Sequence, residues 1–104
     1  MTLEQFRAVL LAADATATHY SSESAGNYTV WAEYGDKALV SDDSRDELDK
    51  VWKIQVDRYT KTPYDTVVDA IRAAFNAEDI SFTYLCDYDQ ETGYIHHIFD
   101  CEVD

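Results

Sequence analysis

The chain has 104 residues, and its 21 acidic and 8 basic side chains give a formal net charge of -13 at pH 7. A chain of this length forms one domain, and a hydrophobic content of 46% predicts an ordered core over residues 1–104. This charge argues against a protein that binds nucleic-acid phosphates through clustered lysine and arginine. It favours a protein that repels other anions or docks on a basic partner.

Neither a membrane span nor a secretion signal is expected. No apolar run approaches the ~20 residues that a spanning helix needs. The segment MTLEQFRAVL at the amino terminus lacks the basic start and long apolar core of a signal peptide. We therefore expect the chain to be cytosolic where it is made.

The first element is predicted to be a helix. Apolar side chains recur at helical spacing from Leu3 to Ala13, and Thr2 and Gln5 have the spacing of a capping box. Residues 14–27 are rich in Thr, Ser, Ala and Gly, which predicts a loop with one short extended stretch at 18–20.

A strand is predicted next. Residues 27–34 alternate between two faces, and Gly35 with Asp36 should end the strand. We expect Trp31 to point to the face that no helix covers. Residues 37–40 are a candidate for another short strand.

The segment SDDSRDELDK at 41–50 is the most highly charged of the chain, and a solvated excursion is its simplest interpretation. Alternate residues from Asp42 to Asp46 are spaced like the first ligands of a calcium loop. Glu47 stands where that loop needs glycine, and Lys53 stands where it needs its closing glutamate. The pattern therefore favours a solvated loop over a calcium site.

The stretch from Val51 to Tyr59 is the predicted central strand, and an amphipathic helix follows it. Apolar side chains share one face of this strand and polar side chains the other: Trp52, Ile54 and Val56 against Lys53, Gln55 and Asp57. Thr62 is the expected N-cap and Pro63 the first helical residue, with an apolar stripe running on to Phe75.

The last two elements read as a hairpin. Strands at 80–88 and 94–103 are joined at 89–93, where Gly93 is expected to supply an unusual backbone angle. Cys86 and Cys101 both fall on apolar sides, which predicts reduced core thiols.

The relative position of the cysteines depends on the turn. A two-residue turn at Thr92-Gly93 would set Cys86 opposite Phe99 and diagonal to Cys101. A slightly different loop would bring the two sulfurs face to face, so a disulfide is the alternative.

The predicted fold is α+β, in the order α-β-(β)-β-α-β-β, with a mainly antiparallel sheet of four or five strands and two helices packed on one face. The covered face should bury these side chains: Trp52, Ile54, Val56, Phe75 and Phe99. The opposite face should leave these to solvent or to another subunit: Trp31, Lys53, Gln55 and His96.

No catalytic, cofactor or metal site is expected. There is no nucleophile elbow and no glycine-rich phosphate loop. His96 and His97 are adjacent on a strand, so they point to opposite faces and cannot readily share one ion. We expect His97 to be a hydrogen-bonded core histidine, and His19 has no identifiable partner in the sequence. Surplus tyrosine and tryptophan instead suggest a protein that assembles.

Three segments carry a resemblance to a known family: KVWKIQVDRYTK, DTVVDAIRAAF and GYIHHIFDCEV. Their order, a strand, then a helix, then a closing hairpin, resembles the small tail-completion proteins of long-tailed bacteriophages and prophages, called tail terminators or head-tail joining proteins. The resemblance implies a structural protein without catalytic residues that forms a homo-oligomeric ring, often a hexamer, on the tail tube.

The resemblance also implies partners and a place. The ring would contact the tail-tube protein and the head connector, in the virion tail or neck, after assembly in the host cytoplasm. The candidate interface residues are Trp31, Asp42, Asp43, Arg45, Asp46 and Glu47. The alternative is an acidic DNA mimic that inhibits a DNA-binding enzyme, which the net charge alone supports.

Overall fold

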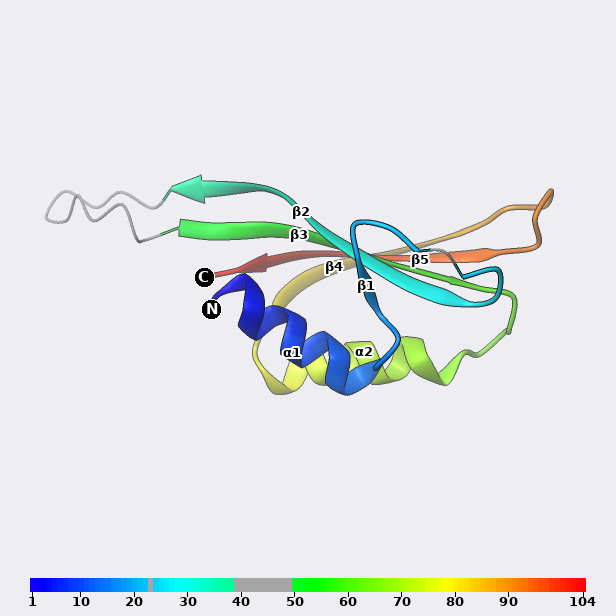
Figure 1. Cartoon of the computed structure of the whole chain (residues 1–104), viewed down its shortest axis with the longest axis horizontal. Coiled ribbons are helices and arrows are strands. Elements are labelled where there is room, and N and C mark those ends of the chain that lie inside the picture. Colours follow the sequence, from blue (N-terminus) through cyan, green and yellow to red (C-terminus); the bar gives the residue numbers. More distant parts are fainter. Residues whose placement is uncertain (23, 39–49) are drawn as a thin grey trace, which may run out of the picture.

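A computed structural model describes residues 1–22, 24–38 and 50–104 of the chain (Figure 1). Its elements are α1 (Leu3–Ala13), β1 (Thr18–His19), β2 (Tyr28–Ala38), β3 (Lys50–Thr60), α2 (Thr66–Ala77), β4 (Ser81–Tyr88) and β5 (Ile95–Val103). The strands form one sheet in the order β1-β2-β3-β5-β4, in which only the short β1 runs parallel to its neighbour. Both helices cover the same face of the sheet (Figure 1). The predicted α+β class is confirmed.

Helix α1 has the predicted bounds and the predicted cap. The Thr2 hydroxyl accepts a hydrogen bond from the Gln5 amide at 3.1 Å, and the Gln5 side chain accepts one from the Thr2 amide at 2.8 Å. This reciprocal pair satisfies two amide groups that a helix start leaves without partners. Phe6 and Leu10 then face the sheet, fully buried. Neither this helix nor α2 is long and apolar enough to cross a membrane.

Helix α2 begins later than the sequence predicts. The N-cap is Asp65, whose carboxylate accepts from the Val67 amide at 3.0 Å, so Thr62 as N-cap and Pro63 as first helical residue are wrong. Tyr64 has a φ of 56°, which turns the chain away from a right-handed helix just after the proline. The helix therefore starts from the cap that follows Tyr64.

The core lies between the helices and the sheet, as predicted. Ile54, Val56, Phe75 and Phe99 are fully buried, whereas Trp52 is only partly buried at the margin of the core. The Phe75 ring meets the Phe99 ring edge to face at 5.7 Å. Each such apolar side chain stabilises the fold by ~1.5–3 kcal/mol relative to leaving it in water.

Trp31 lies on the face opposite to the one predicted. It pairs in register with Val56, is 3% exposed, and its ring centroid is 5.5 Å from that of Phe6. Both faces of β2 carry aromatic side chains, so the alternation alone does not decide which face is buried. Helix α1 is narrow and rich in alanine, which leaves space for the Trp31 side chain beneath it. Tyr28 lies on the open face instead.

Strand β2 continues past its predicted end. A β-bulge between Glu33 and Gly35 absorbs the register shift, and pairing with β3 resumes as far as Ala38. Gly35 and Asp36 therefore lie inside the strand rather than after it. The two strands extend beyond the helical layer as a ribbon (Figure 1). Residues 39–49, which include half of the predicted 37–40 strand and all of the acidic segment except Lys50, lie outside the described residues.

The β4–β5 hairpin forms with Gly93 in the expected left-handed conformation, at a φ of 77°. The loop is longer than a two-residue turn, because the Asp89 amide donates to the Tyr94 carbonyl and the Gly93 amide donates to the Asp89 carbonyl. This loop fixes the register of the two strands.

That register separates the cysteines. Cys86 lies opposite His97 and Cys101 opposite Phe82, so the two positions are offset by ~13 Å along the strands. A disulfide requires Cα atoms within ~7 Å, so this register does not allow one. Both thiols are free; Cys101 is buried, as predicted, but Cys86 is exposed, contrary to prediction. Burial raises the pKa of the Cys101 thiol to about 12.

Candidate functional site

A buried charged cluster joins the sheet to both helices. Arg58 of β3 is 6% exposed, and its Nε and Nη2 atoms each lie 2.9 Å from Oδ2 of Asp65, the α2 cap. Its Nη1 atom lies 3.6 Å from Oδ2 of Asp14, the residue that follows α1. The cluster ties the end of α1 and the start of α2 to β3.

The two carboxylates of the cluster are held in the charged form. Burial by itself raises the pKa of Asp14, but hydrogen bonds led by that of Thr16, together with the Arg58 charge, outweigh burial and lower it. The pKa of Asp65 is lowered in the same way, with burial opposed chiefly by the Val67 amide and Arg58. The cluster is therefore ionised at neutral pH.

Each of the three histidines has a partner in the described chain. His97 faces the helices, and its Nδ1 atom lies 2.6 Å from the Tyr84 hydroxyl, in agreement with a hydrogen-bonded histidine at the margin of the core. Burial lowers the pKa of His97. His96 faces the open side, with Nε2 at 2.7 Å from Oδ1 of Asp57. The two rings point to opposite faces, as predicted.

The sequence identified no partner for His19, and the structure supplies two. Its ring stacks on Trp31 at 3.9 Å between centroids, and its Nε2 atom lies 2.7 Å from a carboxylate oxygen of Glu33. The contact exists because β1 pairs in parallel with β2, which sets His19 beside Trp31. It covers the outer edge of the core.

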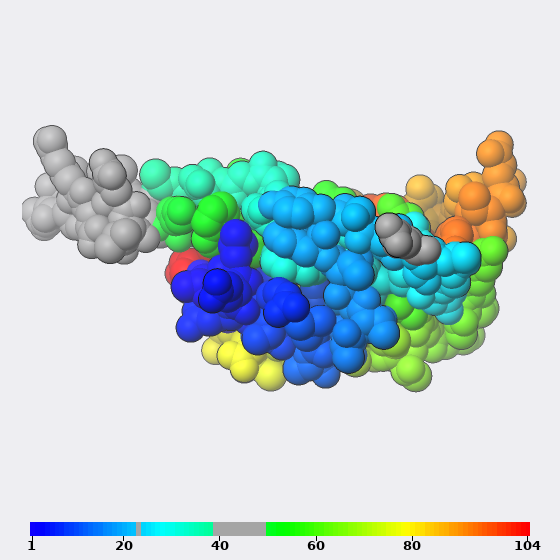
Figure 2. All heavy atoms as spheres, in the orientation of Figure 1, coloured from blue at the N-terminus to red at the C-terminus, as the bar shows by residue number. Residues whose placement is uncertain are grey.

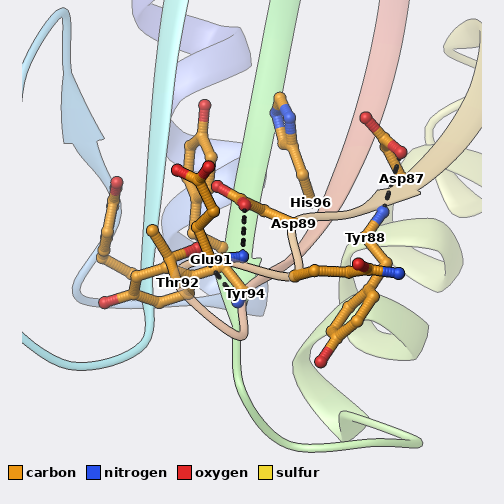
Figure 3. A pocket seen from close by; sticks show the side chains of 10 residues that line it. Asp87, Tyr88, Asp89, Glu91, Thr92, Tyr94 and His96 are labelled. Atoms are coloured by element: carbon orange, nitrogen blue, oxygen red, sulfur yellow. Dashed lines mark hydrogen bonds between the residues drawn. The ribbon is translucent and has the colours of Figure 1, made fainter.

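A hollow in the described surface lies on the open face, where the β4–β5 loop bends over the ends of β2 and β3. It has a volume of about 680 Å³, and we call it the hairpin groove. Its lining residues are Tyr28, Tyr59, Asp87, Tyr88, Asp89, Gln90, Glu91, Thr92, Tyr94 and His96. Figure 3 shows these side chains converging from the loop and the strand ends, and the orange atoms of the hairpin stand out at one end of the molecule in Figure 2.

Aromatic rings form the wall of the hairpin groove. Tyr59 is stacked between Tyr28, at 4.9 Å, and His96, at 4.2 Å, because these residues are directly opposite one another on three adjacent strands. Tyr94 meets both tyrosines edge to face at 6.0 and 6.1 Å. Its hydroxyl donates to the carbonyl of Gly26 at 2.9 Å, which ties the groove to the loop before β2.

Carboxylates form the rim of the same groove. Asp87 and Glu91 line it directly, and Asp57 lies behind the wall on His96. Asp89 accepts from the Glu91 amide at 2.9 Å, and the hydrogen bonds from Glu91 and Thr92 lower its pKa. Burial, followed by neighbouring groups that include Asp57, raises the pKa of both Tyr28 and Tyr59, so these rings are neutral phenols.

The chemistry of the hairpin groove suits the binding of a cation. Electron-rich ring faces and ionised carboxylates both attract cations. No serine or cysteine lines the groove; its Thr92 hydroxyl accepts a hydrogen bond from the Tyr94 amide at 3.3 Å, and His96 contacts Asp57. Across the described ranges, no group of three or more His, Cys, Asp or Glu side chains is arranged to hold a metal ion.

The sheet has two free edges in the described part of the chain. On one side, β4 pairs only with β5 along its whole length, and its exposed residues include Leu85, which is 65% accessible. On the other side, β1 covers only Val30 and Trp31 of β2. The β2 edge from Ala32 to Ala38 is therefore also open to another strand.

Of the predicted interface residues, only Trp31 lies in the part of the chain that the structure describes. Trp31 is buried under α1, which contradicts its predicted exposure and leaves little of its side chain for a partner to contact. The other candidates lie outside the described residues: Asp42, Asp43, Arg45, Asp46 and Glu47.

The sequence reasoning did not find the hairpin groove. The sequence shows a surplus of tyrosine, but the grouping of Tyr59 and Tyr94 with His96 depends on the register between β3 and β5. A signal was present, because a tyrosine stands at the start or the end of each predicted strand: Tyr28, Tyr59, Tyr88 and Tyr94. To predict the groove from these tyrosines, the length of the hairpin loop would have to be known in advance.

Comparison with known proteins gives no assignment. No protein-family model matches the chain, and no curated protein matches it significantly. The functional conclusion therefore comes from the residues and their geometry.

Proposed function

We propose that the protein is a structural assembly protein that closes into a ring through its strand edges, as a tail-completion protein of a phage or prophage would. The observation that carries this proposal is the pair of unlike free edges, β4 on one side of the sheet and the outer part of β2 on the other. The tail assignment rests on the resemblance of the three sequence segments described above.

Unlike edges favour a closed ring. If β4 of one copy adds to β2 of the next, each copy uses both edges once, and the contact is heterologous. A heterologous contact forms a ring when its rotation closes. The open face of the sheet, with its tyrosines and carboxylates, then stays available to the neighbours in the tail, which are the tail-tube protein and the head connector. The ring would end the tube and join it to the head.

Two edge variants test the ring. Leu85→Lys sets a charge on the outer strand β4, and Gly35→Lys sets one on β2, where an added Cβ meets nothing within 4 Å. We expect the unmodified chain to form one closed oligomer in size-exclusion chromatography with light scattering, and each variant to be monomeric. Tyr64→Lys is the matched control, because Tyr64 is 99% exposed and lies outside the strands.

Mixing the variants separates a heterologous contact from a symmetric one. The Leu85→Lys chain keeps its β2 edge and the Gly35→Lys chain keeps its β4 edge, so an equimolar mixture should stop at dimers. Pairing of β4 with β4 would instead leave the Gly35→Lys chain dimeric on its own. A monomeric unmodified chain that also binds no tail-tube or connector protein contradicts the proposal.

A further inference from the structure

We propose that the hairpin groove binds an arginine side chain presented by a partner protein. This inference concerns the open face of the sheet and does not depend on ring formation through the edges. It rests on the wall of the groove, on its rim and on a cation of the chain itself that already occupies one ring face.

The charged side chains that line the groove are all acidic. Among the described residues that line the groove, Asp87, Asp89 and Glu91 carry carboxylates, and none is lysine or arginine. Tyr88 and Tyr94 add electron-rich rings to the same hollow, where Figure 3 labels both. A site of this composition is complementary to a cation that also has a flat, weakly hydrated surface.

The chain itself demonstrates this preference. The Nζ atom of Lys61 lies 4.8 Å from the centroid of the Tyr94 ring, in a cation–π contact at the border of the groove. The Lys61 amide donates to Oδ1 of Asn27 at 2.9 Å, which holds the start of this side chain beside the groove. An internal ammonium therefore already lies over Tyr94, and a ligand cation would use the exposed ring of Tyr88 in the same lining.

Guanidinium fits these features better than other cations. It is planar, stacks on tyrosine rings and donates paired hydrogen bonds to a carboxylate. A bare metal ion needs several converging oxygen or nitrogen ligands, and such a group is missing from the residues that the structure describes. A volume of about 680 Å³ also exceeds that of one side chain, so flanking peptide can enter with the arginine.

Short peptides test the inference directly. The probes are acetyl-Gly-Arg-Gly-amide, its lysine counterpart, and its citrulline counterpart, which has nearly the same shape without the charge. Titration of the ¹⁵N-labelled full chain by NMR should shift the amide signals of Tyr59, Glu91 and Tyr94 with the arginine peptide. The lysine peptide should bind more weakly, and the citrulline peptide should give no saturable shift.

Paired variants separate the groove from the general negative charge. Glu91→Gln should weaken arginine binding by about fivefold, as expected for one partly exposed ion pair, whereas Glu78→Gln at the end of α2 should leave it unchanged. Lys61→Gln should strengthen binding, because it frees the Tyr94 ring and removes a competing cation. Lys53→Gln, on the open face away from the hairpin, is its matched control.

Three outcomes would overturn the inference. Equal binding of the arginine and citrulline peptides would show an apolar groove rather than a cation site. Equal effects of Lys61→Gln and Lys53→Gln, or of Glu91→Gln and Glu78→Gln, would show attraction by net charge alone. Amide shifts spread over the whole open face would show the same. Since the edge variants do not touch the groove, failure here leaves the ring proposal to its own test.

Discussion

Arg58 is a charged residue in the interior of the sheet, and its guanidinium reaches the end of one helix and the start of the other. The Asp65 carboxylate makes two contacts there: Oδ1 accepts from the Val67 amide and caps α2, and Oδ2 pairs with Arg58. A buried ion pair is weak evidence for stability as a whole, but removing one partner leaves an uncompensated charge. The position of α2 therefore depends on this one carboxylate.

Asp65→Ala should lower the free energy of unfolding by about 3 kcal/mol, from the lost cap and the stranded guanidinium together. Asp69→Ala, in the exposed first turn of the same helix, should cost less than ~1 kcal/mol, from its interaction with the helix dipole. Denaturant unfolding of both variants, followed by circular dichroism, measures the difference. Equal losses would mean that the Arg58 cluster contributes nothing specific.

At the scale of elements, β2 shows how far a period-2 pattern can be read. The alternation predicted a strand and which side chains share a face, but it did not identify the buried face, because Tyr28 and Trp31 are both aromatic. The structure buries Trp31 against Phe6 of α1 and leaves Tyr34, which is 55% exposed, on the bulge.

Trp31→Ala should therefore cost about 3–5 kcal/mol of unfolding free energy, the usual loss for a large aromatic side chain removed from a core. Tyr34→Ala should cost much less, since it gives up one hydrogen bond to Asp100 and little buried area. Chemical denaturation of the two variants provides the measurement. A loss below ~0.5 kcal/mol for Trp31→Ala would restore the exposed placement that the alternation suggested.

The parts that the sequence predicted are those fixed by local chemistry. The Thr2–Gln5 capping box, the central strand and the left-handed Gly93 each depend on residues within a few positions of one another. The parts that it missed depend on contacts between distant segments. Asp65 became the cap of α2 because it also meets Arg58, and the hairpin groove exists only because the loop sets β5 in one register against β3.

At the scale of the whole molecule, the net charge of -13 and the buried groups act in opposite directions as the pH falls. Mutual repulsion of surface carboxylates destabilises the folded chain, so protonating these groups raises its stability. The carboxyls of Asp14 and Asp65 have pKa values below the ordinary 3.8, and His97 has a pKa below the ordinary 6.5. For each of these groups the unfolded chain takes up its proton first, so acid favours unfolding.

Two losses of stability are therefore expected on acidification. The first begins near pH 6.5 and ends once the pH passes below the lowered pKa of His97; the second begins near pH 4, where unfolded aspartates protonate before Asp14 and Asp65 do. Surface repulsion is screened by salt, whereas the buried groups are screened much less. Unfolding measured from pH 8 to pH 3 in ~0.5 M NaCl should expose both steps.

Two variants show which group causes each loss of stability. His97→Gln should remove the first step and keep the second, whereas Asp65→Asn should shrink the second and keep the first. Replacing His96, on the open face, serves as the control for the first step. Stability that rises steadily as the pH falls in high salt would mean that carboxylate repulsion dominates even after screening, and the Arg58 cluster would then be a minor contributor to the fold.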